Sequence, residues 1–138
     1  MSSILVTGAE GQLGQCFNTV AKEFPRHNLL FVSKNTLDIT KAKSLARVYK
    51  QYRFDGIINC AAYSKVDQAE FEIEKSRRIN HHGIQNLVDL AEQKDLFIIH
   101  FSTDYIFDGK ERIPFKEEHV SNPLNRYAQS KLAGEKVL

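Results

Sequence analysis

Apolar residues along this chain fall into short β-rich runs that alternate with longer segments of helical periodicity. The β-rich runs occupy residues 4–8, 29–32, 56–60 and 96–101. Helical spacing of apolar residues follows three of them, near 17–24, near 45–52 and over about 70–92, and a last helical segment carries the C-terminal residues. Such alternation is typical of right-handed crossovers in a parallel sheet covered by helices on both faces. We therefore expect an α/β fold with a doubly wound parallel sheet.

A glycine-rich turn joins the first β-rich run to the first helical segment. Gly8, Gly11 and Gly14 are spaced by three residues in GAEGQLG. Glycines here let the backbone approach a pyrophosphate, and the helix that follows offers free N–H groups. The spacing differs from the G-x-G-x-x-G of the standard dinucleotide fingerprint. The turn predicts nucleotide binding, although any tight strand-to-helix turn can use such glycines.

The second β-rich run ends in Ser33-Lys34, where a standard NAD enzyme has an acidic residue for the ribose 2′-hydroxyl. Lys34 suits a 2′-phosphate instead, which favours NADPH over NADH, but a solvated loop lysine is an equally good interpretation. Thr40 is expected to be the N-cap of the next helix. Asp38 either caps that helix or contacts an adenine.

Tyr127 and Lys131 stand four residues apart in NRYAQSKLAGE, so they lie on one face of a helix. An ammonium beside a phenol favours the phenolate, and a tyrosine tuned in this way exchanges protons with carbonyls and alcohols near neutral pH. A solvated helix face gives the same spacing by chance.

Ligands of doubly wound sheets bind at the carboxyl ends of the strands. The glycine turn, Ala61–Tyr63 and Ser102–Asp104 all follow strands, so we expect them at one edge of the sheet.

Composition and charge limit the kinds of partner and the cellular compartment that are expected. The chain has 138 residues and a net charge of +2, which does not favour nucleic acid or an anionic membrane as a partner. No run is long enough to span a membrane and no signal peptide precedes the first strand, so a cytoplasmic protein is expected. Cys16 and Cys60 are expected to behave as small apolar residues. The five histidines show no ligand spacing, which predicts no metal site.

Two charged clusters at the start of the third helical segment and just before it are expected to be surface features. They are the acidic residues Asp67, Glu70, Glu72 and Glu74 and the basic residues Lys75, Arg77 and Arg78.

Several stretches resemble the extended short-chain dehydrogenase/reductases, and within them the dTDP-4-dehydrorhamnose reductases. The matching stretches are VTGAEGQLG, LDIT, INCAAYSKVDQAE, IN at Ile79-Asn80, HFSTDYIFDG and NPLNRYAQSKLAGE, which are spread over the whole chain. The resemblance implies a Rossmann-like fold and NADPH- or NADH-dependent reduction of the C4 keto group of dTDP-4-dehydro-6-deoxy-L-mannose to dTDP-L-rhamnose. It makes residues 1–138 the NAD(P)-binding Rossmann domain, ending after the helix of Tyr127 and Lys131, with the C-terminal substrate domain absent from this chain.

The resemblance also implies roles for individual residues. Tyr127 is the acid/base, Lys131 holds the nicotinamide ribose and tunes Tyr127, and Thr103 stabilises the reacting carbonyl. The dinucleotide contacts are Gly8, Gly11, Gln12, Leu13, Gly14, Asp38, Ile39, Ala61, Ala62 and Tyr63, together with Tyr127 and Lys131. The sugar nucleotide faces Ser64, Val66, Thr103 and Asp104. Asn80 either supports a proton-relay water or closes a helix turn.

Each of these roles has a structural alternative: Thr103 ends a strand and caps a loop, and Tyr63 is a core aromatic. For the whole chain the alternative is a non-catalytic nucleotide-binding or regulatory module of the same fold. An unpaired fourth strand exposes backbone hydrogen-bonding groups, so self-association, including a homo-oligomer, is expected.

Overall fold

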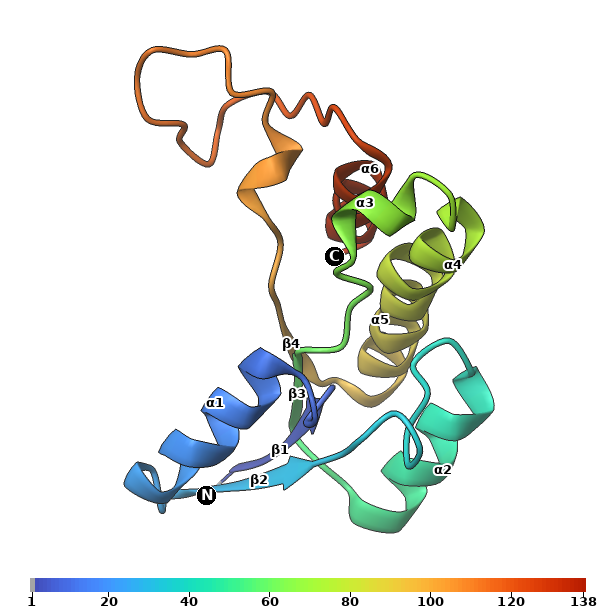
Figure 1. Ribbon diagram of the computed structural model, residues 1–138. Coiled ribbons are helices and arrows are strands. Elements are labelled where there is room, and N and C mark those ends of the chain that lie inside the picture. Colours follow the sequence, from blue (N-terminus) through green and yellow to red (C-terminus); the bar gives the residue numbers. More distant parts are fainter. Residues whose placement is uncertain (1) are drawn as a thin grey trace.

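A computed structural model describes residues 2–138 and contains one sheet of four parallel strands (Figure 1). The strands are β1 (Ser2–Thr7), β2 (His27–Phe31), β3 (Gly56–Asn59) and β4 (Phe97–His100), in the order β2-β1-β3-β4. The registers pair Val6 with Phe31 and with Ile58, so these three strands end at the same edge. The order reverses between β1 and β3, which is the switch point at which doubly wound sheets bind ligands. The expected Rossmann-like α/β fold is confirmed.

Helices cover both faces of the sheet because its central strands are apolar on both sides. Leu5 and Ile57 are fully buried in the core beneath α2 (Ala42–Tyr52) and α5 (Gly83–Lys94). Val6 and Ile58 face the other way, where Phe17 of α1 (Gln12–Val20) packs against them. A side chain alternates in direction at each residue of a strand, so a strand buried on both faces reads as a continuous apolar run.

Two helix boundaries differ from the sequence-based expectation. The helix after β1 ends at Val20, a 3-10 turn (Ala21–Glu23) follows, and Phe24 is 57% exposed rather than part of a buried stripe. The expectation that Thr40 caps the next helix is wrong, because α2 begins at Ala42 after Lys41. Thr40 instead donates to the carboxylate of Asp38 through its backbone N–H (3.0 Å) and its hydroxyl (2.7 Å).

The third helical segment is divided rather than continuous over 70–92. It comprises α3 (Val66–Ala69), α4 (Ile73–Arg77), a π-helical turn, η2 (Arg78–His82), and α5. A π turn inserts an extra residue into a helix and is frequently found at functional sites. Here it contains the buried side chain of Asn80.

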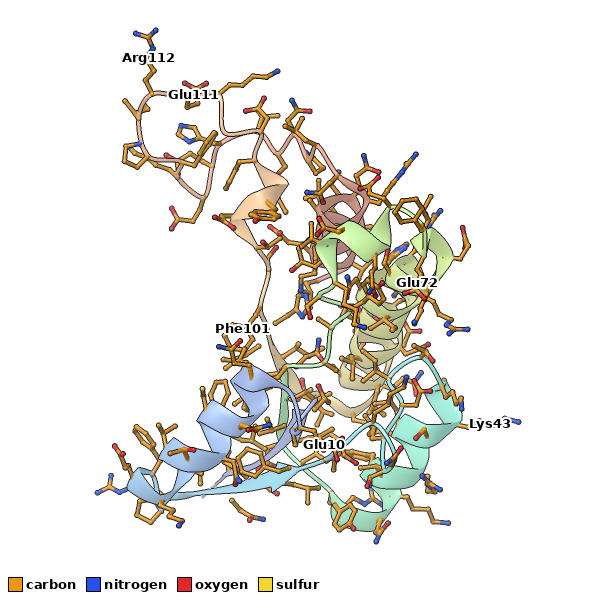
Figure 2. The ribbon with its side chains drawn as sticks, in the orientation of Figure 1. Glu10, Lys43, Glu72, Phe101, Glu111 and Arg112 are labelled. Atoms are coloured by element: carbon orange, nitrogen blue, oxygen red, sulfur yellow. The ribbon has the colours of Figure 1, made fainter. Side chains whose placement is uncertain are left out.

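The last helix, α6 (Arg126–Glu135), follows a short 3-10 helix, η3 (Asp104–Ile106), and a long connection that projects from the body of the fold (Figure 1). Glu111 and Arg112 lie at the far end of this projection in Figure 2. Helix α6 begins at Asn125, whose side-chain oxygen accepts from the N–H of Ala128 at 2.7 Å, as an N-cap does. Within residues 2–138, no helix has the length and apolarity needed to cross a membrane.

Helix α6 packs directly on the backbone of the π turn. Gly134 is buried there, and a Cβ atom at this position would overlap the carbonyl oxygen of Asn80. Ser130, one turn earlier, accepts a hydrogen bond from the Asn80 side chain at 2.9 Å. These contacts fix the position of the helix that carries Tyr127 and Lys131.

We predict that Gly134→Ala lowers the free energy of unfolding by about 1–3 kcal/mol, the usual cost of overpacking. The alanine has the higher helix propensity by about 1 kcal/mol, so any loss arises from the contact with Asn80. Chemical denaturation measures the change. Gln129→Ala on the exposed side of α6 is the matched control and should stay within about 0.5 kcal/mol of the unsubstituted chain. Equal stability of the two variants would contradict the close packing.

Candidate functional site

The turn after β1 requires glycine at its first position. Gly8 has φ +64°, and a Cβ atom there would overlap the backbone of Cys60 and Ala61 after β3. Gly11 is the N-cap of α1 in an extended conformation, and no side chain caps the helix. The N–H groups of the first helical residues, 12–14, therefore have no intrahelical partner and remain available to an anion.

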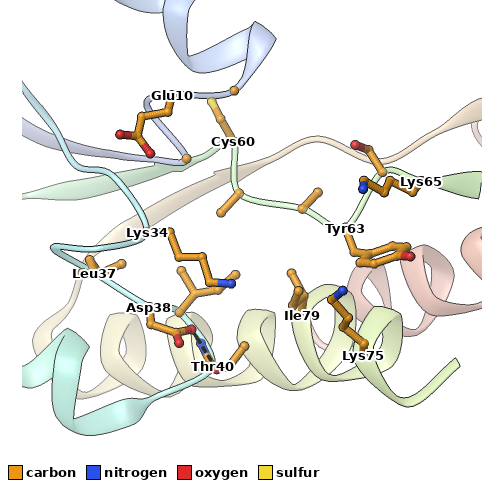
Figure 3. A pocket seen from close by; sticks show the side chains of 16 residues that line it. Glu10, Lys34, Leu37, Asp38, Thr40, Cys60, Tyr63, Lys65, Lys75 and Ile79 are labelled. Atoms are coloured by element: carbon orange, nitrogen blue, oxygen red, sulfur yellow. Dashed lines mark hydrogen bonds between the residues drawn. The ribbon is translucent and has the colours of Figure 1, made fainter. Parts of the chain in front are cut away.

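A cavity of about 370 Å³ lies next to this turn, at the carboxyl ends of β1, β2 and β3 (Figure 3). Its volume is within the range of small-molecule sites. Eight of the residues expected to contact dinucleotide or sugar line it: Gly8, Gly11, Asp38, Ile39, Ala61, Ala62, Tyr63 and Ser64. The structure therefore brings together three segments that are separated in the sequence. Gln12, Leu13, Gly14 and Val66 do not line the cavity, although each lies within three residues of Gly11 or Lys65, which do.

The cavity carries several lysines. Lys34, Lys65 and Lys75 line it, and Figure 3 shows the amines of Lys34 and Lys75 directed into the space from opposite sides. The carboxylate of Asp38 has a lowered pKa, because hydrogen bonds from Thr40 and the charges of Lys41 and Lys34 outweigh the opposing effect of partial burial. An ionised aspartate and several ammonium groups around one space suit a ligand that has both phosphates and hydroxyl groups.

Tyr63 is a buried wall of the cavity rather than a free phenol. Its hydroxyl donates to Glu72 at 2.6 Å, and Glu72 is in turn paired with Lys75 at 2.9 Å. Burial and the bond to Glu72 raise the pKa of Tyr63 to about 12. Glu72 bonds to Tyr63 and Lys75 while 39% of its side chain stays exposed, and Lys75 lines the cavity as well as lying at the surface.

A second group of expected site residues lies outside this cavity, on η3 and α6. The hydroxyl of Thr103 accepts from the N–H of Tyr105 and is 3.3 Å from a carboxylate oxygen of Asp104, to which it donates. The rings of Tyr105 and Tyr127 meet edge to face with centroids 6.3 Å apart. Thr103, Asp104 and Tyr127 are thus on neighbouring elements, η3 and α6.

Lys131 is only 3% exposed, and its Nζ is directed toward the end of β4. It donates to the carbonyl oxygen of Phe101 and lies 3.4 Å from Nε2 of His100. Burial lowers the pKa of Lys131 to about 8, against the opposing charge of Glu135. Among the described residues, 2–138, Lys131 Nζ makes no hydrogen bond to the Tyr127 hydroxyl. The direct contact between the two side chains that their spacing suggested is therefore not present in the structure.

Asn80 connects the residues of the cavity with the residues of helix α6. Its side chain accepts from the N–H of Tyr63 at 2.8 Å, donates to the Tyr63 carbonyl at 2.9 Å and donates to Ser130 of α6. Both donors of the amide are used. The side chain therefore holds the loop after β3 against the helix of Tyr127 and Lys131.

His100 is a half-buried neighbour of Lys131 that the sequence reasoning missed. The partners of its ring, Asn59 and Lys131, lie 41 and 31 residues away in the chain, and no local pattern relates them. Burial, followed by the charge of Lys131, lowers the pKa of His100 to about 4. The one sequence feature that could have identified His100 is its place at the end of the fourth strand, at the ligand-binding edge.

Comparison with known proteins places this geometry in one family. The model of the RmlD substrate binding domain matches residues 1–138. The dTDP-4-dehydrorhamnose reductase of Aggregatibacter actinomycetemcomitans is 37% identical over 138 residues, which is all of this chain and 47% of that protein. The dTDP-4-keto-6-deoxy-D-glucose reductase of Streptomyces niveus is 33% identical over 134 residues, 97% of this chain and 46% of that protein.

Solved structures agree with the sequence comparison. A dTDP-4-dehydrorhamnose reductase from Clostridium acetobutylicum superimposes with a TM-score of 0.93 at 33% identity, covering 98% of this chain and 48% of that structure. The reductase from Bacillus anthracis, in complex with NADP, gives a TM-score of 0.91 at 35% identity over 99% of this chain and 48% of that structure.

The chain spans about half the length of the relatives it matches. Since the family model covers every residue of the sequence, the chain belongs to the RmlD substrate binding domain family.

Proposed function

We propose that this chain is the NAD(P)-binding part of a reductase that converts dTDP-4-dehydro-6-deoxy-L-mannose to dTDP-L-rhamnose. The cavity at the switch point of the sheet, with Tyr127, Thr103 and Lys131 on adjoining elements, is the observation that carries the proposal. The relatives named dTDP-4-dehydrorhamnose reductases support the reaction class. One relative is named for a different sugar, 4-keto-6-deoxy-D-glucose. The identity of the sugar substrate is therefore also proposed.

The residues of the cavity fit a dinucleotide. The backbone at Gly8 leaves no room for a side chain, the start of α1 offers free N–H groups, and lysine amines enter the space. We propose that Gly11, Gln12, Leu13 and Gly14 approach the pyrophosphate, that Asp38 and Ile39 lie at the adenine side, and that Ala61, Ala62 and Tyr63 lie along the adjoining ribose and phosphate. A bound NADPH or NADH supplies the hydride for carbonyl reduction.

The chain's own residues manage the proton and the developing charge. Tyr127 donates its phenolic proton to the C4 oxygen of the sugar. The hydroxyl of Thr103 turns from Asp104 to the same oxygen, where a hydrogen bond stabilises negative charge. Lys131 holds the ribose and tunes Tyr127, while Ser64, Val66 and Asp104 face the sugar nucleotide.

NADPH preference is assigned to Lys34. Its amine enters the cavity beside Asp38, one carboxylate oxygen of which accepts both hydrogen bonds from Thr40. The ammonium suits a 2′-phosphate, and Ser33-Lys34 follows β2 where a standard NAD enzyme has an acidic residue for the ribose 2′-hydroxyl.

We predict that Lys34→Ala weakens NADPH binding about tenfold and leaves NADH binding unchanged, because one charge-assisted hydrogen bond is worth roughly 1.5–3 kcal/mol. Calorimetric titration of this chain with each dinucleotide measures the difference. Lys50→Ala, which removes the same charge from the exposed end of α2, is the matched control. Equal loss for both dinucleotides, or a clear preference of the unsubstituted chain for NADH, would refute the role of Lys34.

We predict that Tyr127→Phe lowers the rate of NADPH oxidation by the dTDP-4-keto sugar about 10²–10⁴-fold, the usual contribution of a general acid. The assay uses the protein as it occurs naturally. Tyr105→Phe removes the hydroxyl of the neighbouring ring and should retain the rate. Unchanged turnover in Tyr127→Phe would overturn the acid role, and nucleotide binding without any turnover in the unsubstituted protein would favour a non-catalytic module.

A further inference from the structure

A line of polar side chains runs from the end of β1 to α6, buried except at the partly exposed ring of His100. Its members are Thr7, Asn59, His100 and Lys131, and the first, second and last are no more than 3% exposed. Thr7 Oγ1 lies 2.6 Å from Asn59 Oδ1, and Asn59 Nδ2 lies 3.0 Å from His100 Nδ1. His100 Nε2 lies 3.4 Å from Lys131 Nζ. Each strand of the sheet except β2 contributes one member.

The direction of these hydrogen bonds is fixed at the β1 end. The N–H of Ala61 donates to Thr7 Oγ1 at 3.3 Å, so the single hydroxyl proton of Thr7 is free to donate to Asn59 Oδ1. Asn59 Nδ2 then lies 3.3 Å from the carbonyl oxygen of Ala61, to which it donates. A flipped amide would place two acceptors against each other at that point, so the orientation of Asn59 is set from both sides.

This orientation determines the tautomer of His100. Because the Asn59 amide donates to Nδ1, that nitrogen must have its lone pair free. A neutral imidazole then carries its proton on Nε2, the nitrogen that faces Lys131. The low pKa of His100, about 4, keeps the ring neutral at physiological pH.

An Nε2–H group facing Lys131 distinguishes between the two forms of the lysine. An ammonium has only donors, so it meets His100 donor against donor, whereas a neutral amine accepts from Nε2–H and still donates to the Phe101 carbonyl. Glu135, on the same helix, opposes this by favouring the ammonium, and Ser102 donates to its carboxylate at 2.6 Å. The facing groups from β1 and β3, Thr7 and Asn59, do not titrate.

We propose that His100 is a positioning residue for Lys131: Thr7 and Asn59 hold it as the Nε2–H tautomer, which directs the lysine to the end of β4 and favours its neutral amine. The catalytic meaning rests on the proposed function, in which the Lys131 ammonium supports Tyr127. His100 then adds to the effect of burial and lowers the pH above which that support is lost.

The tautomer is measurable in this chain without nucleotide or substrate. Long-range ¹H–¹⁵N spectra of ¹⁵N-histidine-labelled protein at pH 7 should show His100 Nδ1 without a proton and Nε2 with one, and the exposed His27 supplies the reference for a solvated ring. Protonated Nδ1, in a neutral ring or an imidazolium, would overturn the proposal. This measurement needs no variant, so it stands even where a substitution prevents folding.

The effect on Lys131 is measured by following its ¹³Cε resonance with pH. His100→Asn keeps an acceptor near Asn59 and removes the group that faces Lys131, so the titration midpoint of Lys131 should rise by about one pH unit. His27→Asn, the matched control, should leave the midpoint unchanged. An unchanged midpoint in His100→Asn would refute the proposal. If the unsubstituted protein does not reduce the sugar but the His100 and Lys131 spectra are as predicted, the proposed function is wrong and the inference about His100 stands.

Discussion

The side-chain amide of Asn80 is the contact on which the arrangement of the site depends. It is 1% exposed and makes three hydrogen bonds, two to the backbone of Tyr63 and one to Ser130. An unsatisfied buried amide is costly, so each partner is held in place. The amide sits in a π turn, and Gly134 lets α6 approach the backbone of the same turn. The cavity wall and the helix of Tyr127 are thus fixed by one residue.

A second constraint is electrostatic. The buried end of Lys131 is surrounded by a backbone carbonyl and a neutral imidazole rather than by a carboxylate in direct contact. Burial therefore dominates and lowers the pKa of the amine to about 8. By contrast, the amine of Lys34 enters the open space of the cavity, where a phosphate group is able to pair with it. The same residue type serves two purposes because its surroundings differ.

Much of the fold was predictable from the sequence because it depends on local periodicity. The apolar runs locate all four strands to within two residues at each end, and the glycine turn identifies the edge at which the cavity lies. The boundaries that failed depend on competing local contacts. Thr40 bonds to Asp38 instead of capping α2, and the π turn at 78–82 interrupts a helix whose apolar pattern gives no sign of it.

The parts of the site that were missed depend on partners distant in the chain. From the sequence, Glu72 was expected to be a surface acid and Tyr63 a possible core aromatic, so the hydrogen bond between them was not predicted. His100 was one of five histidines without a distinguishing pattern. Neither residue has a spacing that indicates its partner. The roles of Tyr127, Thr103 and Lys131 come from the family resemblance, and the structure adds where Lys131 is directed.

We propose that the edge of the sheet beside Gly8 binds a dinucleotide. Amide chemical-shift mapping of this chain during titration with NADPH tests it most directly. The account predicts the largest shifts in residues 8–14, 34–40 and 61–64, which converge on the cavity. Shifts confined to other surfaces, or none at millimolar NADPH, would contradict it.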